Sequence, residues 1–93
     1  MEIDRQETET SGRYVVVLEQ SSEAYLTFIK QSSDTIVIDH TFVPPKFRGR
    51  GIAAKLAKKA FEDAKNEGKR IVPQCPYIAA LIRRNPDLQG LSA

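Results

Sequence analysis

Hydrophobic residues along the chain form three short apolar runs, and a longer segment with helical spacing follows them. The runs Tyr14–Leu18, Ala24–Ile29 and Thr35–Val43 are rich in β-branched and aromatic residues, and turn-forming residues separate them. Each run therefore predicts a strand, and the short connections predict antiparallel pairing. A short edge strand is predicted at residues 2–6, where only Ile3 is apolar.

The third run alternates between its two faces. Side chains in a strand alternate with a period of two, which predicts one face of Ile36, Ile38, His40 and Phe42 and another of Val37, Asp39, Thr41 and Val43. We therefore expect His40 to share a face with large apolar residues and Asp39 to point away from it.

The segment after Pro44-Pro45 predicts an amphipathic helix that starts near Arg50 or Gly51 and ends at Gly68 as its C′ residue. Its apolar positions recur at steps of three and four: Ile52, Ala53, Leu56, Ala57, Ala60, Phe61 and Ala64. The apolar residues 70–73 then predict a strand parallel to the third run. A second helix is predicted from Pro76 to Asn85-Pro86, and residues 87–93 are expected to be irregular.

The predicted order β-β-β-β-α-β-α is typical of an α+β fold with a mixed, mainly antiparallel sheet covered by two helices. Ninety-three residues suffice for one small domain, so we expect residues 1–93 to form a single unit.

The composition, with 41% hydrophobic and 28% charged residues, is that of an ordinary globular protein. No apolar run reaches transmembrane length, and the first residues lack a signal-peptide pattern. The single cysteine, Cys75, has no internal disulfide partner, which favours a reducing compartment. We therefore expect an intracellular, cytoplasmic protein with no membrane partner.

Charge is unevenly distributed along the chain. Residues 1–41 carry a net charge of −5, and residues 42–93 carry +7. The basic half is expected to meet an anion, although solvated lysines on a helix surface are the simpler interpretation of most of it. Nucleic acid is not expected as a partner, because Glu62, Asp63 and Glu67 interrupt the basic residues and no recognition motif is present.

The stretch Arg48-Gly49-Arg50-Gly51-Ile52-Ala53 lies between a predicted strand and a predicted helix. Glycines let backbone amides approach a phosphate, and the start of a helix adds a favourable dipole. The stretch has neither the spacing of a P-loop nor the third glycine of a dinucleotide fingerprint. The alternative is an ordinary turn with surface arginines.

Two side chains outside this turn are candidates for chemistry. Cys75 directly precedes Pro76, the predicted first residue of a helix, and a helix start favours a thiolate nucleophile. His40 is the only histidine and is a candidate general base. The alternatives are a buried structural cysteine and a core histidine. With one Cys, one His and no clustered carboxylates, no transition-metal site is expected.

Arg48, Gly51 and Ala53 fit the Gln/Arg-x-x-Gly-x-Gly/Ala signature of the GNAT N-acetyltransferase superfamily, which the chain resembles. It resembles most closely the small GNAT-like group called YjdJ-type or N-acetyltransferase domain-containing proteins. The matching segments are Asp39-His40-Thr41-Phe42-Val43-Pro44, the glycine turn, Val72-Pro73-Gln74-Cys75-Pro76-Tyr77 and Asn85-Pro86.

The resemblance implies a minimal GNAT fold that binds acetyl-CoA or CoA between the third long strand and the strand before Cys75. The implied cofactor-binding residues are Phe42, Val43, Arg48, Gly49, Arg50, Gly51, Ile52 and Ala53. Cys75 would lie near the thioester as a catalytic residue, with His40 close by. Tyr77 could protonate the leaving thiolate or belong to the core.

The implied activity is transfer of an acetyl group from acetyl-CoA to an unidentified amine, either directly or through Cys75. We expect a monomer or a weak dimer. Larger GNAT enzymes insert acceptor-binding helices between their first two strands, and this chain has no room for them. A non-catalytic CoA-binding module is therefore the alternative.

Overall fold

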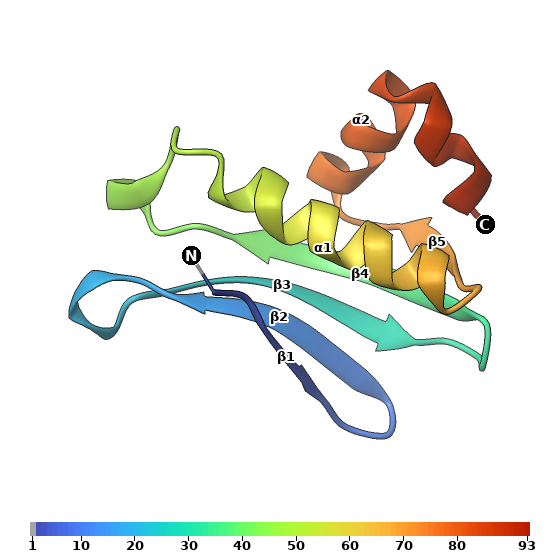
Figure 1. Ribbon diagram of the computed structural model, residues 1–93, viewed down its shortest axis with the longest axis horizontal. Helices are drawn as coiled ribbons and strands as arrows, with labels where there is room; N and C mark the ends of the chain where they lie inside the picture. The colour runs from blue at the N-terminus through green and yellow to red at the C-terminus, as the bar shows by residue number, and fades with distance from the viewer. Residues whose placement is uncertain (1) are drawn as a thin grey trace.

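A computed structural model describes residues 2–93 as a five-stranded sheet with two α-helices (Figure 1). The elements are β1 (Asp4–Glu7), β2 (Ser11–Val17), η1 (Glu19–Ser21), β3 (Glu23–Lys30), β4 (Thr35–Phe42), η2 (Pro45–Phe47), α1 (Ile52–Asn66), β5 (Arg70–Pro73), α2 (Pro76–Arg84) and η3 (Pro86–Leu91). The strands lie side by side in chain order, all antiparallel except the parallel pair β4–β5. The predicted element order and the mixed sheet are confirmed.

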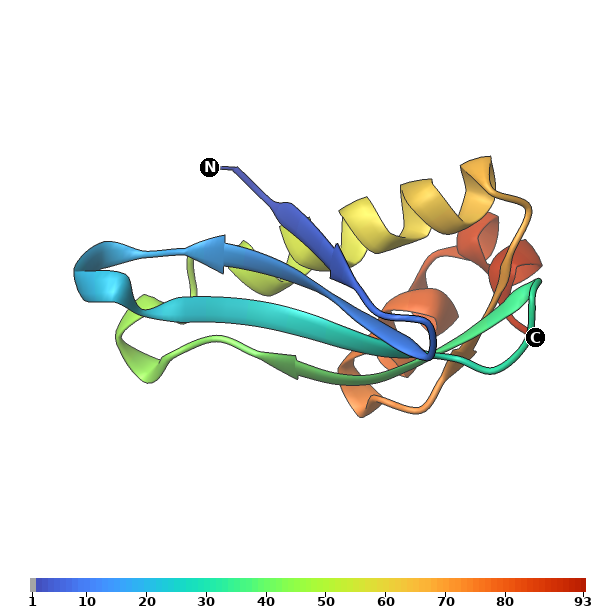
Figure 2. The same ribbon diagram turned by 90° about the horizontal axis from the view of Figure 1, so that it is seen from below.

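Helix α1 lies along one face of the sheet, as Figure 2 shows. Its buried residues are those of the predicted apolar stripe, apart from Ala53, which is half-buried. The buried residues of α1 and α2 join a single core cluster with side chains from one sheet face, namely Tyr14, Val16, Ala24, Leu26, Phe28, Ile36, Ile38 and Ile71. The opposite face has no buried helix residue against it among residues 2–93, and it leaves Val17 66% exposed and Ile29 45% exposed.

A β-bulge in β4 corrects the predicted faces of that strand. Phe28 pairs with Ile38, but Thr27 pairs with His40, so Asp39 is the extra residue. Beyond the bulge the alternation is reversed, and Thr41, opposite the buried Leu26, faces the helices. The prediction that His40 and Phe42 share a face with Ile36 and Ile38 was therefore wrong. The prediction that Asp39 points away from His40 was also wrong. The Asp39 carboxylate accepts a 2.7 Å hydrogen bond from Thr27, the residue that is paired with His40.

The C-terminal residues are also more regular than predicted. Residues 86–91 form the 3-10 helix η3, and Ser92 makes a parallel bridge with Ile71 on the edge of β5. The amide of Ala93 donates to the carbonyl of Ile71 at 2.8 Å. The apolar Leu88 and Leu91 pack against the core, which gives this segment a fixed position.

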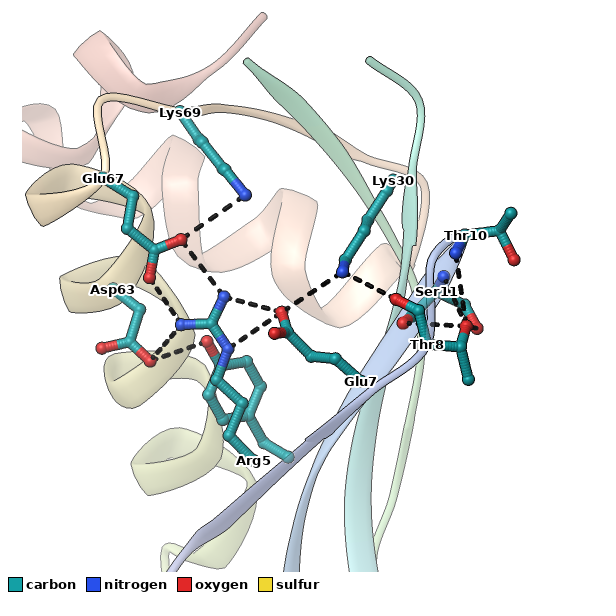
Figure 3. A network of polar contacts seen from close by, with 10 residues as sticks. Arg5, Glu7, Thr8, Thr10, Ser11, Lys30, Asp63, Glu67 and Lys69 are labelled. Carbon is teal, nitrogen blue, oxygen red and sulfur yellow. Dashed lines mark hydrogen bonds and ion pairs between the residues drawn. The ribbon is translucent and has the colours of Figure 1, made fainter. Parts of the chain in front are cut away.

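The C-terminal half of α1 is tied to β1 by a network of charged side chains around Arg5 (Figure 3). The Arg5 guanidinium contacts Glu7 at 2.8 Å, Asp63 at 3.1 Å and Glu67 at 2.6 Å. The hydrogen bond from Arg5 holds the pKa of Glu67 below its ordinary value and raises that of Arg5. Tyr14 donates to Asp63 at 2.8 Å, and burial followed by this hydrogen bond raises the pKa of Tyr14.

The last turn of α1 is closed by a Schellman motif. Gly68 has φ +68°, and its amide donates to the carbonyl of Lys65 at 3.3 Å. The next amide, that of Lys69, donates to the carbonyl of Ala64 at 2.8 Å. The prediction of Gly68 as the C′ residue is confirmed.

Candidate functional site

A cavity of about 390 Å³ lies where β4 ends and α1 begins. It is lined by Thr41, Phe42, Val43, Phe47, Arg48, Gly49, Gly51, Ile52, Ala53, Ala54 and Tyr77. Seven of the eight residues predicted to bind a cofactor are among them, and Arg50 is the exception. The strand β4, the glycine turn, the first turn of α1 and the first turn of α2 therefore all face one space.

The start of α1 leaves its backbone donors free. Gly51 is the N-cap with φ +76°, and no side chain caps this end of the helix. None of the hydrogen bonds found among residues 2–93 uses the amides from Gly49 to Ala54, whereas the amide of Lys55 donates to the carbonyl of Gly51. A Cβ added at Gly49 or Gly51 would meet no atom within 4 Å, so open space surrounds both glycines. Free amides at the positive end of a helix dipole form an anion-binding surface.

The two arginines of the turn lie on different sides of it. Arg48 lines the cavity and donates through Nε to the carbonyl of Val43 at 3.0 Å, which leaves its terminal guanidinium nitrogens available. The guanidinium of Arg50 lies over the Phe47 ring, 5.3 Å from its centroid, and borders a different hollow with Leu18 and Ile52. Only Arg48 therefore adds positive charge directly to the wall of the cavity.

The pairing of β4 with β5 ends early, at Ile38 opposite Pro73. There the amide of Cys75 donates to the carbonyl of Ile38 at 2.9 Å, and the chain turns into α2. The backbone of β4 from Asp39 to Phe42 is thus bordered by β3 on one side, and no strand formed by residues 2–93 pairs with it on the other. This unpaired edge leads into the cavity, because Thr41 and Phe42 line it.

Cys75 is a free, buried thiol at the N-cap of α2, with 5% of its surface exposed. It is absent from the cavity lining, and its Sγ lies 3.7 Å from Oγ1 of Thr41, which does line the cavity. Tyr77, two residues later, is half-buried and also lines the cavity. The thiol therefore lies one side chain behind the cavity wall.

His40 is not brought together with Cys75. The bulge turns it to the helix-free face of the sheet, where it is exposed and its ring lies 6.0 Å from that of Tyr25. Cys75 contacts Thr41 on the helix-covered face instead. The two predicted catalytic side chains thus lie on opposite faces of β4.

Thr41, Phe47 and Ala54 line the cavity but were not among the predicted site residues. No signal in the sequence identifies Thr41, since its orientation depends on the bulge at Asp39. Phe47 ends η2 directly before the glycine turn and is 4% exposed, so its apolar character was a usable signal. Residues 2–93 hold no group of three or more metal-ligating side chains. None of the helices they form is long and apolar enough to span a bilayer.

Comparison with known proteins gives a consistent result. Residues 13–91 match the GCN5-related N-acetyl-transferase family. Protein NATD1 of Xenopus tropicalis is 38% identical over 63 residues, which cover 68% of this chain and 58% of the relative. Protein NATD1 of Danio rerio is 35% identical over 69 residues, covering 74% and 63% of the two chains. The chain thus spans less than two thirds of the length of these relatives.

A solution NMR structure of a GCN5-like protein from Staphylococcus aureus superposes on 97% of this chain and 87% of its own, with a TM-score of 0.73. The TM-score shows that the two proteins, which are 22% identical in sequence, share a fold. The family match over residues 13–91 shows that the chain belongs to the GCN5-related N-acetyl-transferase family.

Proposed function

We propose that the chain binds acetyl-CoA in the cavity between β4 and α1 and transfers the acetyl group to an amine. The observation that carries the proposal is the set of free amides from Gly49 to Ala54 on the wall of a cavity that also opens onto the unpaired edge of β4. The amides and Arg48 suit a pyrophosphate. The strand edge suits the amide groups of a pantetheine arm, which need backbone partners of this kind.

The cavity alone is shorter than a CoA molecule, and a neighbouring hollow offers room for the rest. Ala54 also borders a space of about 700 Å³ between α1, α2 and η3. Lys58 and Lys65 lie on its wall, together with the acids Glu62 and Asp87. We assign this hollow to the adenosine end of the cofactor, with the two lysines as partners for its phosphate.

Binding is tested by calorimetry with CoA, acetyl-CoA and ATP, together with thermal unfolding of the same samples. CoA and acetyl-CoA are expected to bind and to raise the melting temperature, and ATP is expected to do so much less. Arg48→Ala should weaken CoA binding by about tenfold, the effect of one charge-assisted hydrogen bond. Arg50→Ala is the matched control and should change the affinity by no more than about threefold, because the Arg50 guanidinium lies over the Phe47 ring and Arg50 does not line the cavity.

Equal losses in the two variants would contradict the assignment of Arg48 to the cavity wall. No binding of CoA or acetyl-CoA by the unsubstituted protein would overturn the proposed function itself.

Two routes are open for the transfer step. In the direct route an amine attacks the thioester, and in the covalent route Cys75 first takes the acetyl group. The second candidate function is a CoA-binding module without transfer activity. It is favoured by the tight β1–β2 hairpin, which leaves only residues 8–10 between the strands. Acetylation of any member of a broad amine panel would exclude it, whereas CoA binding without acetylation would favour it.

A further inference from the structure

The helix-free face of the sheet is left open in this protein. No buried helix residue lies against it among residues 2–93, and the β1–β2 hairpin, with only residues 8–10 between its strands, adds no covering element. Val17 is 66% exposed and Ile29 is 45% exposed. Exposed apolar side chains that gather on one face mark a contact site for a partner.

Three rings gather on this face where β3 and β4 lie side by side. The Tyr25 ring lies 5.4 Å from that of Phe42 and 6.0 Å from that of His40, measured between centroids. Tyr25 and Phe42 are paired directly across the two strands, and His40 is exposed. Aromatic rings attract an ammonium group and pack against the aliphatic stem that carries it.

The charged side chains of the face carry an excess of acid. Strand pairing places the acids Asp4, Glu23 and Asp39 on it. Arg13 is the one base that strands β1 to β4 place there, and its guanidinium lies 3.6 Å from Glu23 and donates to Gln6 at 2.8 Å. The face therefore complements a cation, whereas the basic half of the chain, which contains the glycine turn, complements an anion.

Asp39 also borders a hollow of about 330 Å³ on this face, together with Arg13, Thr27 and Ile29. Thr27 donates to one carboxylate oxygen of Asp39 at 2.7 Å, which fixes the side chain. The other carboxylate oxygen takes part in none of the hydrogen bonds found among residues 2–93. The hollow therefore presents a fixed, charged acceptor to an N–H donor.

The helix-free face meets the proposed cofactor cavity at the unpaired edge of β4. Pairing of β4 with β5 ends at Ile38, and the bulge residue Asp39 follows directly. Phe42 lines the cavity and also contacts the Tyr25 ring on the helix-free face. Only the width of one strand, about 4.8 Å, separates the face from the cavity here. The four-carbon stem of a lysine is long enough to cross it.

We infer that the helix-free face binds a polypeptide acceptor and presents one of its lysine side chains to the cofactor at the edge of β4. This inference rests on the proposed function and names the class of its amine. Asp39 and the Tyr25 ring hold the lysine side chain, and the exposed Ile29 contacts residues beside it. A free small amine suits the face less well, because small ligands bind where most of their surface is buried, and this face is open.

The test is calorimetric binding of a short synthetic peptide with one central lysine to the full chain saturated with CoA, which has no acetyl group to transfer. Replacement of that lysine by norleucine keeps the stem, removes the ammonium group and should weaken binding by about tenfold. Nα-acetyl-lysine amide, the same lysine without its neighbours, should bind much more weakly than the peptide.

Asp39→Asn keeps an oxygen that accepts from Thr27 and removes the charge, so it should weaken binding of the lysine peptide by about tenfold. Asp34→Asn, the same change in the turn before β4, is the matched control and should leave the affinity within about threefold. Tyr25→Leu removes one ring and should weaken the peptide by about threefold. None of the three should change the affinity for CoA.

Equal losses in Asp39→Asn and Asp34→Asn would overturn the inference, because they would reflect net charge alone. Equal binding of the peptide and of Nα-acetyl-lysine amide would overturn it by making the acceptor a small amine. A dimer in sedimentation velocity that Ile29→Glu dissociates would also overturn it, since a second copy would cover the face. If Asp39→Asn lowers the melting temperature substantially, the norleucine peptide and Tyr25→Leu decide in its place.

Each of these outcomes leaves CoA binding intact. Absence of CoA binding by the unsubstituted protein would instead overturn the proposed function, and the inference with it.

Discussion

The two ends of α1 differ in how their backbone and side-chain groups are satisfied. The C-terminal end is closed by the Schellman motif at Gly68 and held to β1 by Arg5 through Asp63 and Glu67. The N-terminal end has no capping side chain, and the amides from Gly49 to Ala54 have no partner among residues 2–93. One end of the same helix therefore supports the fold, and the other is left open at the cavity.

The unpaired backbone donors are therefore confined to the N-terminal end of α1 and are not a property of the whole helix. Unsatisfied helix donors are normally capped by a side chain within one turn. Here the residues at the N-terminal end are two glycines with positive φ, which expose the amides and add no side chain. Stability contributed by the closed end can offset the lost capping energy at the open end, which amounts to about 1 kcal/mol.

Among the substitutions that test this difference between the two ends, Asp63→Ala at the closed end is expected to cause the largest loss of stability. Asp63 accepts hydrogen bonds from Arg5 and Tyr14, and its side chain is only 16% exposed. Its removal leaves the buried Tyr14 hydroxyl without its partner and takes one of three carboxylates from Arg5, so we expect a loss of about 2–3 kcal/mol in the free energy of unfolding. Urea denaturation measures this loss, and Glu62→Ala, an exposed neighbour on the same helix, is the control.

Calorimetry on the folded Asp63→Ala protein should give an unchanged CoA affinity. A large loss of affinity would mean that the two ends of the helix are coupled and would contradict their separate roles.

A pair of glycine substitutions gives the sharpest comparison. Gly51 and Gly68 have φ of +76° and +68°, and an added Cβ meets nothing within 4 Å at either position. Gly51→Ala and Gly68→Ala should therefore each destabilise the fold by about 1 kcal/mol through backbone strain alone. Thermal and urea unfolding check this equality. Only Gly51→Ala should weaken CoA binding, because only its backbone borders the cavity.

If both variants lowered the CoA affinity equally, the effect would come from stability and not from the site.

Tyr14→Phe is expected to cause a smaller loss of stability, and the size of this loss depends on pH. The Tyr14 hydroxyl donates to Asp63, and its removal should cost about 1 kcal/mol at neutral pH. Because burial and this hydrogen bond raise the pKa of Tyr14 in the folded state, its contribution is complete below the ordinary value of 10.0 and is lost as the pH rises through the folded value. The stability difference between the two proteins should therefore shrink above pH 10. In urea unfolding, a difference that stayed constant as the pH rose well above 10 would contradict the assignment.

Features that depend on residues close together in the sequence could be predicted, and features that depend on contacts between distant residues could not. Local sequence patterns predicted the features that depend on residues within a few positions of each other. These are the apolar stripe of α1, the end of α1 at Gly68 and the turn at Gly49 and Gly51. The bulge at Asp39 depends on pairing with β3, and no local pattern distinguishes it from regular alternation. It therefore reversed the predicted positions of Thr41 and His40.

The network around Arg5 could not be predicted from local sequence patterns either. Arg5 and Asp63 are 58 positions apart, and their contact exists only because β1 lies at the edge of the sheet beneath the end of α1. The cavity lining was largely predicted, since it follows one continuous segment from Phe42 to Ala53. Cys75 and Tyr77 come from another part of the chain: the helix start at Pro76 made Cys75 a candidate, the resemblance placed it near the thioester, and of the two only Tyr77 lines the cavity.

Amide chemical shifts during a CoA titration test most directly whether the open end of α1 holds the phosphates of CoA. We expect the amide signals of residues 49–54 to move most, together with those of Thr41 and Phe42, while those of Glu67 and Gly68, which line neither hollow, stay in place. Arg48→Ala should reduce the shifts at a given CoA concentration. Shifts that spread evenly over both ends of α1, or an unchanged glycine turn at saturating CoA, would contradict it.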